Sequence, residues 1–196
     1  MKPFAALLLA LAALLPLPAR AQHAAPPPAP PAAEARQFDF LLGAWELEVQ
    51  PKVSSLVALL HGAPKLVGSW RAWKVFDGRG IEDELRIVDA NGNPLTLNRA
   101  LRVYAAGEQR WKVCGADGYR ARTSEATGKL VDGEMRMEGH LTEAPGETVL
   151  TRTRYTEITP TSFRMVQDRS EDGGKTWEEG ALTIVAKRVA ATATPG

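Results

Sequence analysis

Two consecutive segments decide the fold, the alternating run Ile81-Glu82-Asp83-Glu84-Leu85-Arg86-Ile87 and the turn Asp89-Ala90-Asn91-Gly92-Asn93-Pro94. Apolar and charged side chains alternate along the first segment, which is typical of a β-strand with one buried face, and Asp83 falls on the apolar face. Asn91-Gly92 can adopt the positive φ angles of a tight hairpin turn. The two segments therefore predict an antiparallel hairpin whose second strand lies at 97–103.

Further segments of the same kind follow one another along most of the chain. They are rich in Val, Ile, Thr, Trp and Tyr, and turns of Gly, Asn, Asp and Pro separate them. They predict an all-β fold, an antiparallel up-and-down β-barrel of about 8–10 strands, with a sandwich of the same strands as the alternative. One short helix is expected at 53–61, after the first strand. The expected strands are 45–49, 66–76, 81–87, 98–104, 109–114, 119–124, 134–141, 149–158, 163–170 and 180–188.

The first 21 residues have the features of a secretory signal peptide. Lys2 supplies the positive charge, and residues 4–15 form an apolar run that is too short for a permanent membrane anchor. Ala19-Arg20-Ala21 is a typical cleavage site, so we expect the mature chain to begin at Gln22. The sequence therefore predicts a periplasmic or secreted protein without a stable membrane anchor.

The remaining chain divides by composition. Residues 22–37 are mostly Ala and Pro, and they are predicted to form a flexible spacer because they cannot bury enough surface to become ordered. Residues 38–189 are predicted to form the β-barrel domain, which is long enough to enclose a core. Residues 190–196 are predicted to be a disordered tail.

Charge and cysteine content exclude several kinds of protein. The formal net charge of the chain is +1, and loss of Lys2 and Arg20 with the signal peptide changes it to −1. Because a nucleic-acid-binding protein is expected to have a basic face, nucleic acid is not predicted as a partner. Cys114 is the only cysteine, so no disulfide can form within the chain and stability must come from the core.

Alternation along each strand assigns the inward-facing side chains. Asp83 and Arg99 share faces with apolar residues on the two strands of the Asn-Gly hairpin, so we expect them to lie near each other inside the barrel. An apolar interior with a few polar groups is typical of a small-molecule pocket. We therefore predict an exported protein that binds a small apolar or amphipathic ligand without catalysis. The candidate ligand-binding residues are Asp83, Arg99, Trp111, Met137, Tyr155, Met165, Gln167 and Arg169.

Two other functions remain open. Asp83 could act as the general base of an isomerase or hydrolase if burial raised its pKa, although the chain has no recognisable catalytic motif. Alternatively, the barrel could be a structural or interaction domain that is filled by its own side chains. No metal or other cofactor is predicted, because His23, His61, His140 and Cys114 do not have the spacing of metal ligands.

The most specific motifs lie at the two ends of the barrel region, Phe38-Asp39-Phe40-Leu41-Leu42-Gly43-Ala44-Trp45 and Asp168-Arg169-Ser170-Glu171-Asp172-Gly173-Gly174-Lys175-Thr176-Trp177. Together they resemble a family of secreted and cytosolic bacterial proteins of unknown function that begin with F-D-F-x-x-G-x-W and end with D-G-G-x-T-W. The resemblance covers residues 38–188. That family looks lipocalin-like (calycin superfamily), which implies an antiparallel barrel with a ligand-sized interior.

The same motifs carry local expectations. Gly43-Ala44-Trp45 matches the G-x-W of lipocalins, which implies that Trp45 stacks on Arg188 or Lys187 of the final strand. The segment 170–177 fits the Asp-box pattern S-x-D-x-G-x-T-W of sialidases, which implies a folded hairpin without a catalytic role. Nitrobindin, a haem-binding relative, has a similar barrel. Haem ligation requires an inward histidine, and His140 is predicted to face outward, whereas His61 at the end of the expected helix could reach the barrel mouth and leaves haem open as an alternative.

Overall fold

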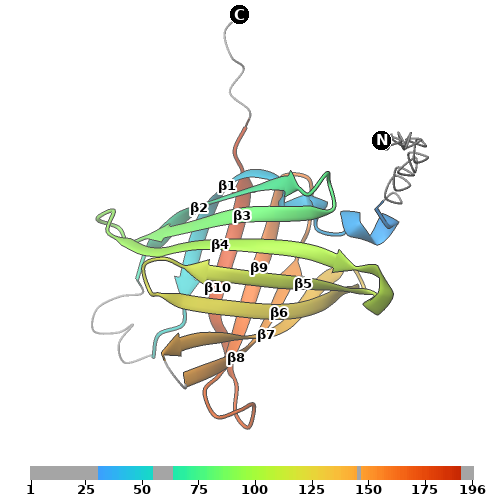
Figure 1. Cartoon of the computed structure of the whole chain (residues 1–196). Helices are drawn as coiled ribbons and strands as arrows, with labels where there is room; N and C mark the ends of the chain where they lie inside the picture. The colour runs from blue at the N-terminus through green and yellow to red at the C-terminus, as the bar shows by residue number, and fades with distance from the viewer. Residues whose placement is uncertain (1–30, 55–63, 145–146, 191–196) are drawn as a thin grey trace, which may run out of the picture. The chain divides into compact units, whose positions relative to one another are not determined.

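Ten antiparallel strands form one closed up-and-down barrel in the computed structural model, which describes residues 31–54, 64–144 and 147–190 (Figure 1). Each strand pairs with its neighbours in the sequence, and the first strand completes the ring by pairing with the last. The predicted barrel is confirmed, and a sandwich is excluded. The strands are β1 (Gly43–Pro51), β2 (Leu66–Val75), β3 (Gly80–Val88), β4 (Pro94–Ala105), β5 (Arg110–Asp117), β6 (Arg122–Val131), β7 (Glu134–Ala144), β8 (Glu147–Thr156), β9 (Ser162–Ser170) and β10 (Glu178–Arg188).

Short 3-10 helices precede the first strand. These are η1 (Ala33–Arg36) and η2 (Asp39–Leu41). A third 3-10 helix, η3 (Ala106–Glu108), follows β4. Ala33–Arg36, within the predicted spacer at 22–37, form η1, in which Ala35 is buried. The helix predicted at 53–61 lies almost entirely outside the described residues. Within the described part of the chain, no helix has both the length and the apolar character needed to cross a membrane.

The predicted Asn-Gly hairpin joins β3 to β4. The Oδ1 atom of Asp89 accepts hydrogen bonds from the backbone amides of Asn91 and Asn93 at 2.8 and 2.9 Å, and Gly92 has a φ of 83°. Ile87 lies opposite Thr96, with a β-bulge between this pair and the turn. Directly opposite residues face the same side of a sheet, so this register decides which side chains of β4 point inward.

One end of the barrel is closed by the segment that leads into β1. Phe38 and Leu41 are fully buried there. The ring of Phe38 packs edge-on against Trp111, with ring centroids 4.9 Å apart and an interplanar angle of 87°. The indole of Trp45 donates a hydrogen bond to the carbonyl oxygen of Leu41 at 2.8 Å, which holds η2 against the barrel. The F-D-F-x-x-G-x-W motif is therefore the plug of this end, called the closed end below.

Arg188 fastens the plug from the last strand. Its guanidinium lies 4.1 Å from the ring centroid of Trp45, which confirms the predicted stacking. It also donates hydrogen bonds to the carbonyl oxygens of Leu42 and Pro160 at 2.8 and 2.6 Å. Gly43 has a φ of 104°, and a Cβ atom there would lie 2.6 Å from the Arg188 guanidinium, so the motif requires glycine at this position.

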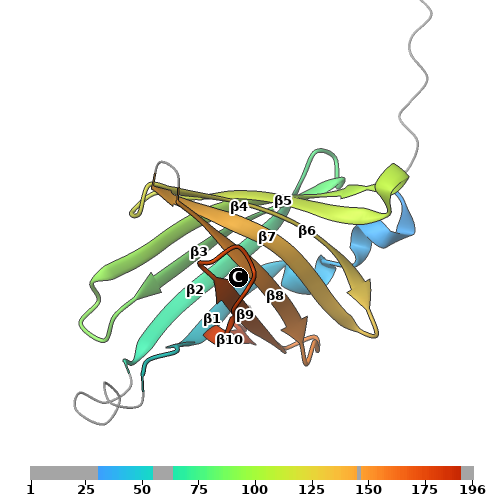
Figure 2. The same cartoon turned by 90° about the horizontal axis from the view of Figure 1, so that it is seen from below.

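The Asp-box segment forms the turn between β9 and β10. The carboxylate of Asp172 accepts hydrogen bonds from the amide and hydroxyl of Thr176 and from the hydroxyl of Ser170, and the indole of Trp177 donates to the carbonyl of Gly174. The predicted folded hairpin is confirmed. It lies at the end opposite the plug (Figure 1), which is the end from which Figure 2 views the barrel and is called the open end below.

Candidate ligand-binding site

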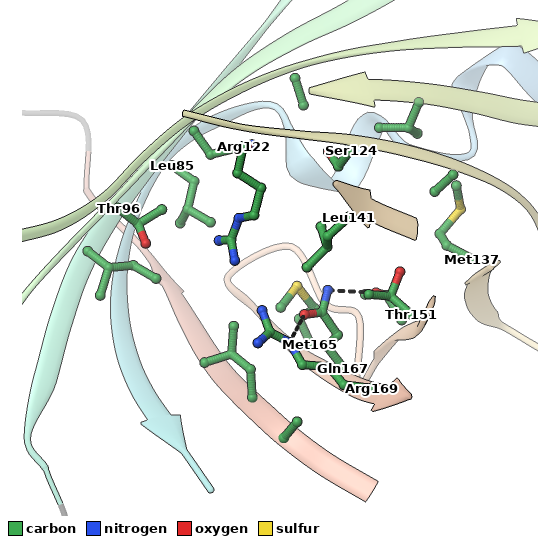
Figure 3. Close-up of a pocket in the computed structure, with 18 of the residues that line it drawn as sticks. Leu85, Thr96, Arg122, Ser124, Met137, Leu141, Thr151, Met165, Gln167 and Arg169 are labelled. Carbon is green, nitrogen blue, oxygen red and sulfur yellow. Dashed lines mark hydrogen bonds between the residues drawn. The ribbon is translucent and has the colours of Figure 1, made fainter. Parts of the chain in front are cut away.

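The open half of the barrel interior holds a cavity of about 280 Å³ (Figure 3). This volume lies near the lower end of the range for small-molecule pockets, roughly 300–1,000 Å³. The cavity extends to Arg120, whose side chain is exposed, and to hydroxyl groups on β4, β6 and β8. Its wall combines aliphatic and thioether side chains with polar and charged ones. The apolar wall residues include Leu85, Val113, Met137, Leu141, Met165 and Leu182.

A buried ion pair lies beneath the floor of the cavity. The carboxylate of Asp83 is fully buried, and it accepts hydrogen bonds from the indole of Trp70 at 2.8 Å and from Nε of Arg102 at 2.7 Å. Arg102 and Trp70 line the cavity, whereas Asp83 does not. Because both carboxylate oxygens already accept hydrogen bonds, Asp83 is poorly placed to take a proton from a ligand in the cavity.

Electrostatic effects hold the floor groups in fixed protonation states. Burial alone would lower the pKa of Arg102, but the adjacent Asp83 carboxylate raises it above its ordinary value. Burial raises the pKa of the Tyr155 hydroxyl, and the nearby positive charge of Arg102 opposes that shift only in part. The guanidinium also lies 5.1 Å from the ring centroid of Phe38. The floor is therefore a charge-balanced unit with a neutral phenol.

Arg99 does not point into the barrel, so the prediction that it faces the lumen beside Asp83 is wrong. Its side chain is 56% exposed, and Nη2 lies 3.0 Å from Oε1 of Glu82. The guanidinium also lies 5.4 Å from the ring centroid of Trp73 on the outer surface. Arg102 takes the position beside Asp83 that was expected for Arg99.

The error on β4 has a physical cause. Apolar residues were assumed to mark the inward face, and Leu97, Leu101 and Val103 alternate with Arg99 in that way. The observed inward face instead carries Thr96 and Ala100, which are buried, together with Arg102. Small and polar side chains on this face leave the space that the cavity occupies.

Three arginines line the cavity near the open end, on different elements. Arg122 starts β6, and its guanidinium lies 2.7 Å from Oε1 of Glu143 and 3.5 Å from Oδ2 of Asp117. Arg169 on β9 is partly buried, and its Nε donates to Oε1 of Gln167 at 3.4 Å. Arg120 is the third. Figure 3 shows Arg122 and Arg169 extending into the same space from different strands.

Arg169 has no carboxylate partner within ion-pair distance among the described residues. All aspartates and glutamates of the chain lie between Glu34 and Glu179, within the described ranges, so no carboxylate side chain lies outside them. Burial, with the positive charge of Arg122, lowers the pKa of Arg169 below its ordinary value. An arginine remains protonated at neutral pH even so. Arg169 therefore forms no direct ion pair, and the charges of Glu143 and of Glu178, which lies opposite it on β10, only partly oppose the lowering of its pKa.

The structure brings most of the predicted site residues to the cavity. Met137, Tyr155, Met165, Gln167 and Arg169 line it, and their role in ligand binding stays a prediction. Trp111 is fully buried in the closed half, where it contacts Phe38 and is not part of the cavity wall.

Sequence reasoning missed Arg102 and Arg122. Arg102 could have been found from the hairpin register, because the residue opposite Asp83 is Ala100 and Arg102 lies on the same face. Arg122 falls within a segment that was predicted to be a strand but whose inward face was not assigned. Among the described residues, no group of three or more His, Cys, Asp or Glu side chains is arranged to hold a metal ion.

Comparisons with known proteins bear on the fold. No protein-family model and no curated protein sequence matches the chain. The S-type phycobiliprotein lyase CPES from Guillardia theta is similar over 83% of this chain and 100% of its own, with 12% identity and a TM-score of 0.52. EF1p2_mFAP2b, solved bound to DFHBI, is similar over 80% of this chain and 100% of its own, with 10% identity and a TM-score of 0.42. At 12% identity, the likeness to the lyase shows a shared β-barrel fold and nothing about the ligand.

Proposed function

We propose that this protein binds one small, partly apolar molecule inside its barrel. The observation that carries the proposal is the cavity of about 280 Å³ in the open half, whose wall joins thioether and aliphatic side chains to hydrogen-bonding groups. Apolar walls supply contact area, and sparse polar groups fix the orientation of a ligand. A barrel that served only as a structural domain would gain stability by filling this space, since empty volume in a core costs contact energy.

The geometry gives less support to an enzyme that uses Asp83 as a general base. Asp83 is absent from the cavity wall, and removing its carboxylate from Arg102 would leave a buried cation without a partner. Binding without catalysis needs no such rearrangement. The proposed function is therefore that of a carrier or sensor of a small molecule.

Export and family membership belong to the same proposal. We propose that residues 1–21 are removed between Ala21 and Gln22, that the mature protein works in the periplasm or outside the cell, and that it belongs to the lipocalin-like family named above. The intact mass of protein recovered from the periplasm of a Gram-negative host should equal that of a chain starting at Gln22. Recovery of the full-length chain from the cytosol alone would contradict the export proposal.

A neutral fluorescent probe tests binding in the lumen. N-phenyl-1-naphthylamine is apolar, and its emission increases when it leaves water. It should bind the wild-type protein saturably with one site per barrel. Ala100→Trp, on the inward face of β4, should fill the cavity and weaken the affinity at least about tenfold, because the probe and the indole compete for the same volume.

The matched control places the same side chain outside the barrel. Ala116 is exposed on β5 and lies opposite Arg99, so Ala116→Trp should leave probe affinity within about twofold of wild type. Circular dichroism would verify that both variants keep the barrel. The proposal fails if the wild type shows no saturable binding, or if both tryptophan variants bind the probe as the wild type does.

A further inference from the structure

The arginines inside the barrel differ in whether they form a direct ion pair. At the floor, Arg102 and Asp83 form an ion pair at 2.7 Å. Near the open end, Arg122 contacts both Glu143 and Asp117. Arg169 has no such partner, although it is partly buried and lines the cavity. Glu143 and Glu178 act on Arg169 only from beyond ion-pair distance. A half-buried guanidinium without a direct partner is costly, and an anion in the cavity would supply that contact.

The neighbourhood of Arg169 strengthens this reading. Arg122 extends into the same space from another strand (Figure 3), and its positive charge is among the causes that lower the pKa of Arg169. Arg120 contributes a third guanidinium at the same end, and its Nε donates to the carbonyl oxygen of Leu95. Guanidinium groups present paired N–H donors that match the two oxygens of an acidic group. Like charges that converge on one space favour an anion between them.

The rest of the cavity defines the remainder of the ligand. Met137 and Met165 line it between the arginines and the floor, and a thioether side chain adapts to aromatic or aliphatic shapes. The floor cation is already neutralised by Asp83, and Tyr155 is a neutral phenol. The distal end of the cavity therefore offers no free charge for a second acidic group.

We propose that the ligand is an organic monoanion with an apolar body, whose acidic group binds Arg169 and Arg122 near the open end while its body lies against Met137 and Met165. This inference rests on the proposed binding function and specifies its ligand class. Carboxylates and sulfonates of suitable size share the required chemistry, which is a singly charged planar or tetrahedral oxyanion attached to an apolar group.

Two probes that differ by one acidic group test the inference. 8-Anilinonaphthalene-1-sulfonate is N-phenyl-1-naphthylamine with a sulfonate added. The wild-type protein should bind the sulfonate at least about tenfold more tightly than the neutral probe. Arg169→Gln keeps a hydrogen-bonding side chain without the charge, and it should remove most of that preference, measured as the ratio of the two probe affinities in the same variant.

Three further variants make the test specific. Arg169→Lys keeps the charge without the paired donors and should restore part of the preference. Arg99→Gln removes an arginine from the outer surface and should leave the affinities for both probes unchanged. Ala100→Trp should weaken the sulfonate as well as the neutral probe, which would show that the sulfonate binds in the lumen and not on the surface.

The outcomes separate this inference from the function on which it rests. If the neutral probe binds in the lumen and the sulfonate binds no better, the ligand is not an anion and only the inference is overturned. Equal losses of both probes in Arg169→Gln would assign Arg169 a structural role and also overturn it. If neither probe binds the wild type, the proposed binding function fails, and the inference fails with it.

Discussion

The closed and open halves of the barrel are built from the same strands but filled in opposite ways. Strand β9 contributes the inward residues Phe163, Met165, Gln167 and Arg169 in order along its length. Phe163 is fully buried in the closed half, with its ring centroid 4.9 Å from that of Trp45, whereas Gln167 and Arg169 border the cavity. A change from aromatic to polar side chains along one strand thus separates the closely packed half from the half that holds the cavity.

The largest expected effect contrasts the charges of the two halves. Asp83→Asn leaves Arg102 buried without a counter-charge and should lower the free energy of unfolding by about 3–5 kcal/mol. Arg169→Gln removes a cation that has no partner, so it should change that free energy by no more than about 1 kcal/mol. Urea denaturation of both variants provides the comparison. Similar losses in the two variants would mean that the halves do not differ in this way.

The second comparison concerns the packing of two inward residues on β9, and the expected difference in stability between its two variants is smaller. Phe163→Ala empties a site that is closely packed by other aromatic rings and should cost about 3–5 kcal/mol. Met165 already borders the cavity, so its side chain loses fewer contacts, and Met165→Ala should cost about 2 kcal/mol or less. Denaturation midpoints at equal m-values would measure both. A larger loss for Met165→Ala would show that the open half is as tightly packed as the closed half.

The smallest effect concerns the Asp-box turn at the open end. Hydrogen bonds from the Thr176 amide, the Thr176 hydroxyl and the Ser170 hydroxyl lower the pKa of Asp172 from 3.8 to about 2. A lowered carboxyl pKa contributes stability above pH 4, and this contribution is lost as the pH falls from about 4 to about 2. The difference in Tm between wild type and Asp172→Asn should therefore be small and constant above pH 5 and should shrink below pH 4. A difference that does not change between pH 5 and pH 2 would contradict the assignment.

Much of the fold was predictable because the alternation of side chains within single strands agrees with the faces they have in the closed barrel. Strict alternation in β3 placed Ile81, Asp83, Leu85 and Ile87 on one face, and that is the face that points inward. The resemblance of Gly43-Ala44-Trp45 to the lipocalin G-x-W implied that Trp45 stacks on Arg188 or Lys187, and the structure has Arg188 there. These features depend on neighbours in sequence or on one pairing, so a single sequence carries them.

The inward face of β4 was not predicted, because two signals in that strand disagree. Its larger apolar side chains, among them Leu101 and Val103, lie on the outer face, whereas Arg102 lies inside with Asp83. The hairpin turn predicts the correct register. If Asn91-Gly92 is counted as a two-residue loop, Ile87 lies opposite Thr96, which is the observed pair. Register from a turn is thus a better guide than apolar content where a strand lines a polar cavity.

The cavity itself could not be read from the sequence. Its volume is the interior space that remains after side chains from all ten strands have packed, and no local sequence pattern predicts that volume. The lack of a partner for Arg169 is likewise visible only once the positions of Glu143 and Asp117 beside Arg122 are known. Composition indicated a pocket with sparse polar groups, and the structure assigns which of them are already neutralised.

Closure of the ring by β1 and β10 has a consequence for how the chain acquires this structure. Lys187 Nζ lies 2.8 Å from Glu48 Oε1 although 139 positions separate the two residues in the sequence. Contacts of such long range form late, since the loop-closure entropy must be overcome before they can contribute. Until β10 has been synthesised, β1 and β9 have free edges that can pair with other chains, so aggregation competes with folding until the final strand is in place.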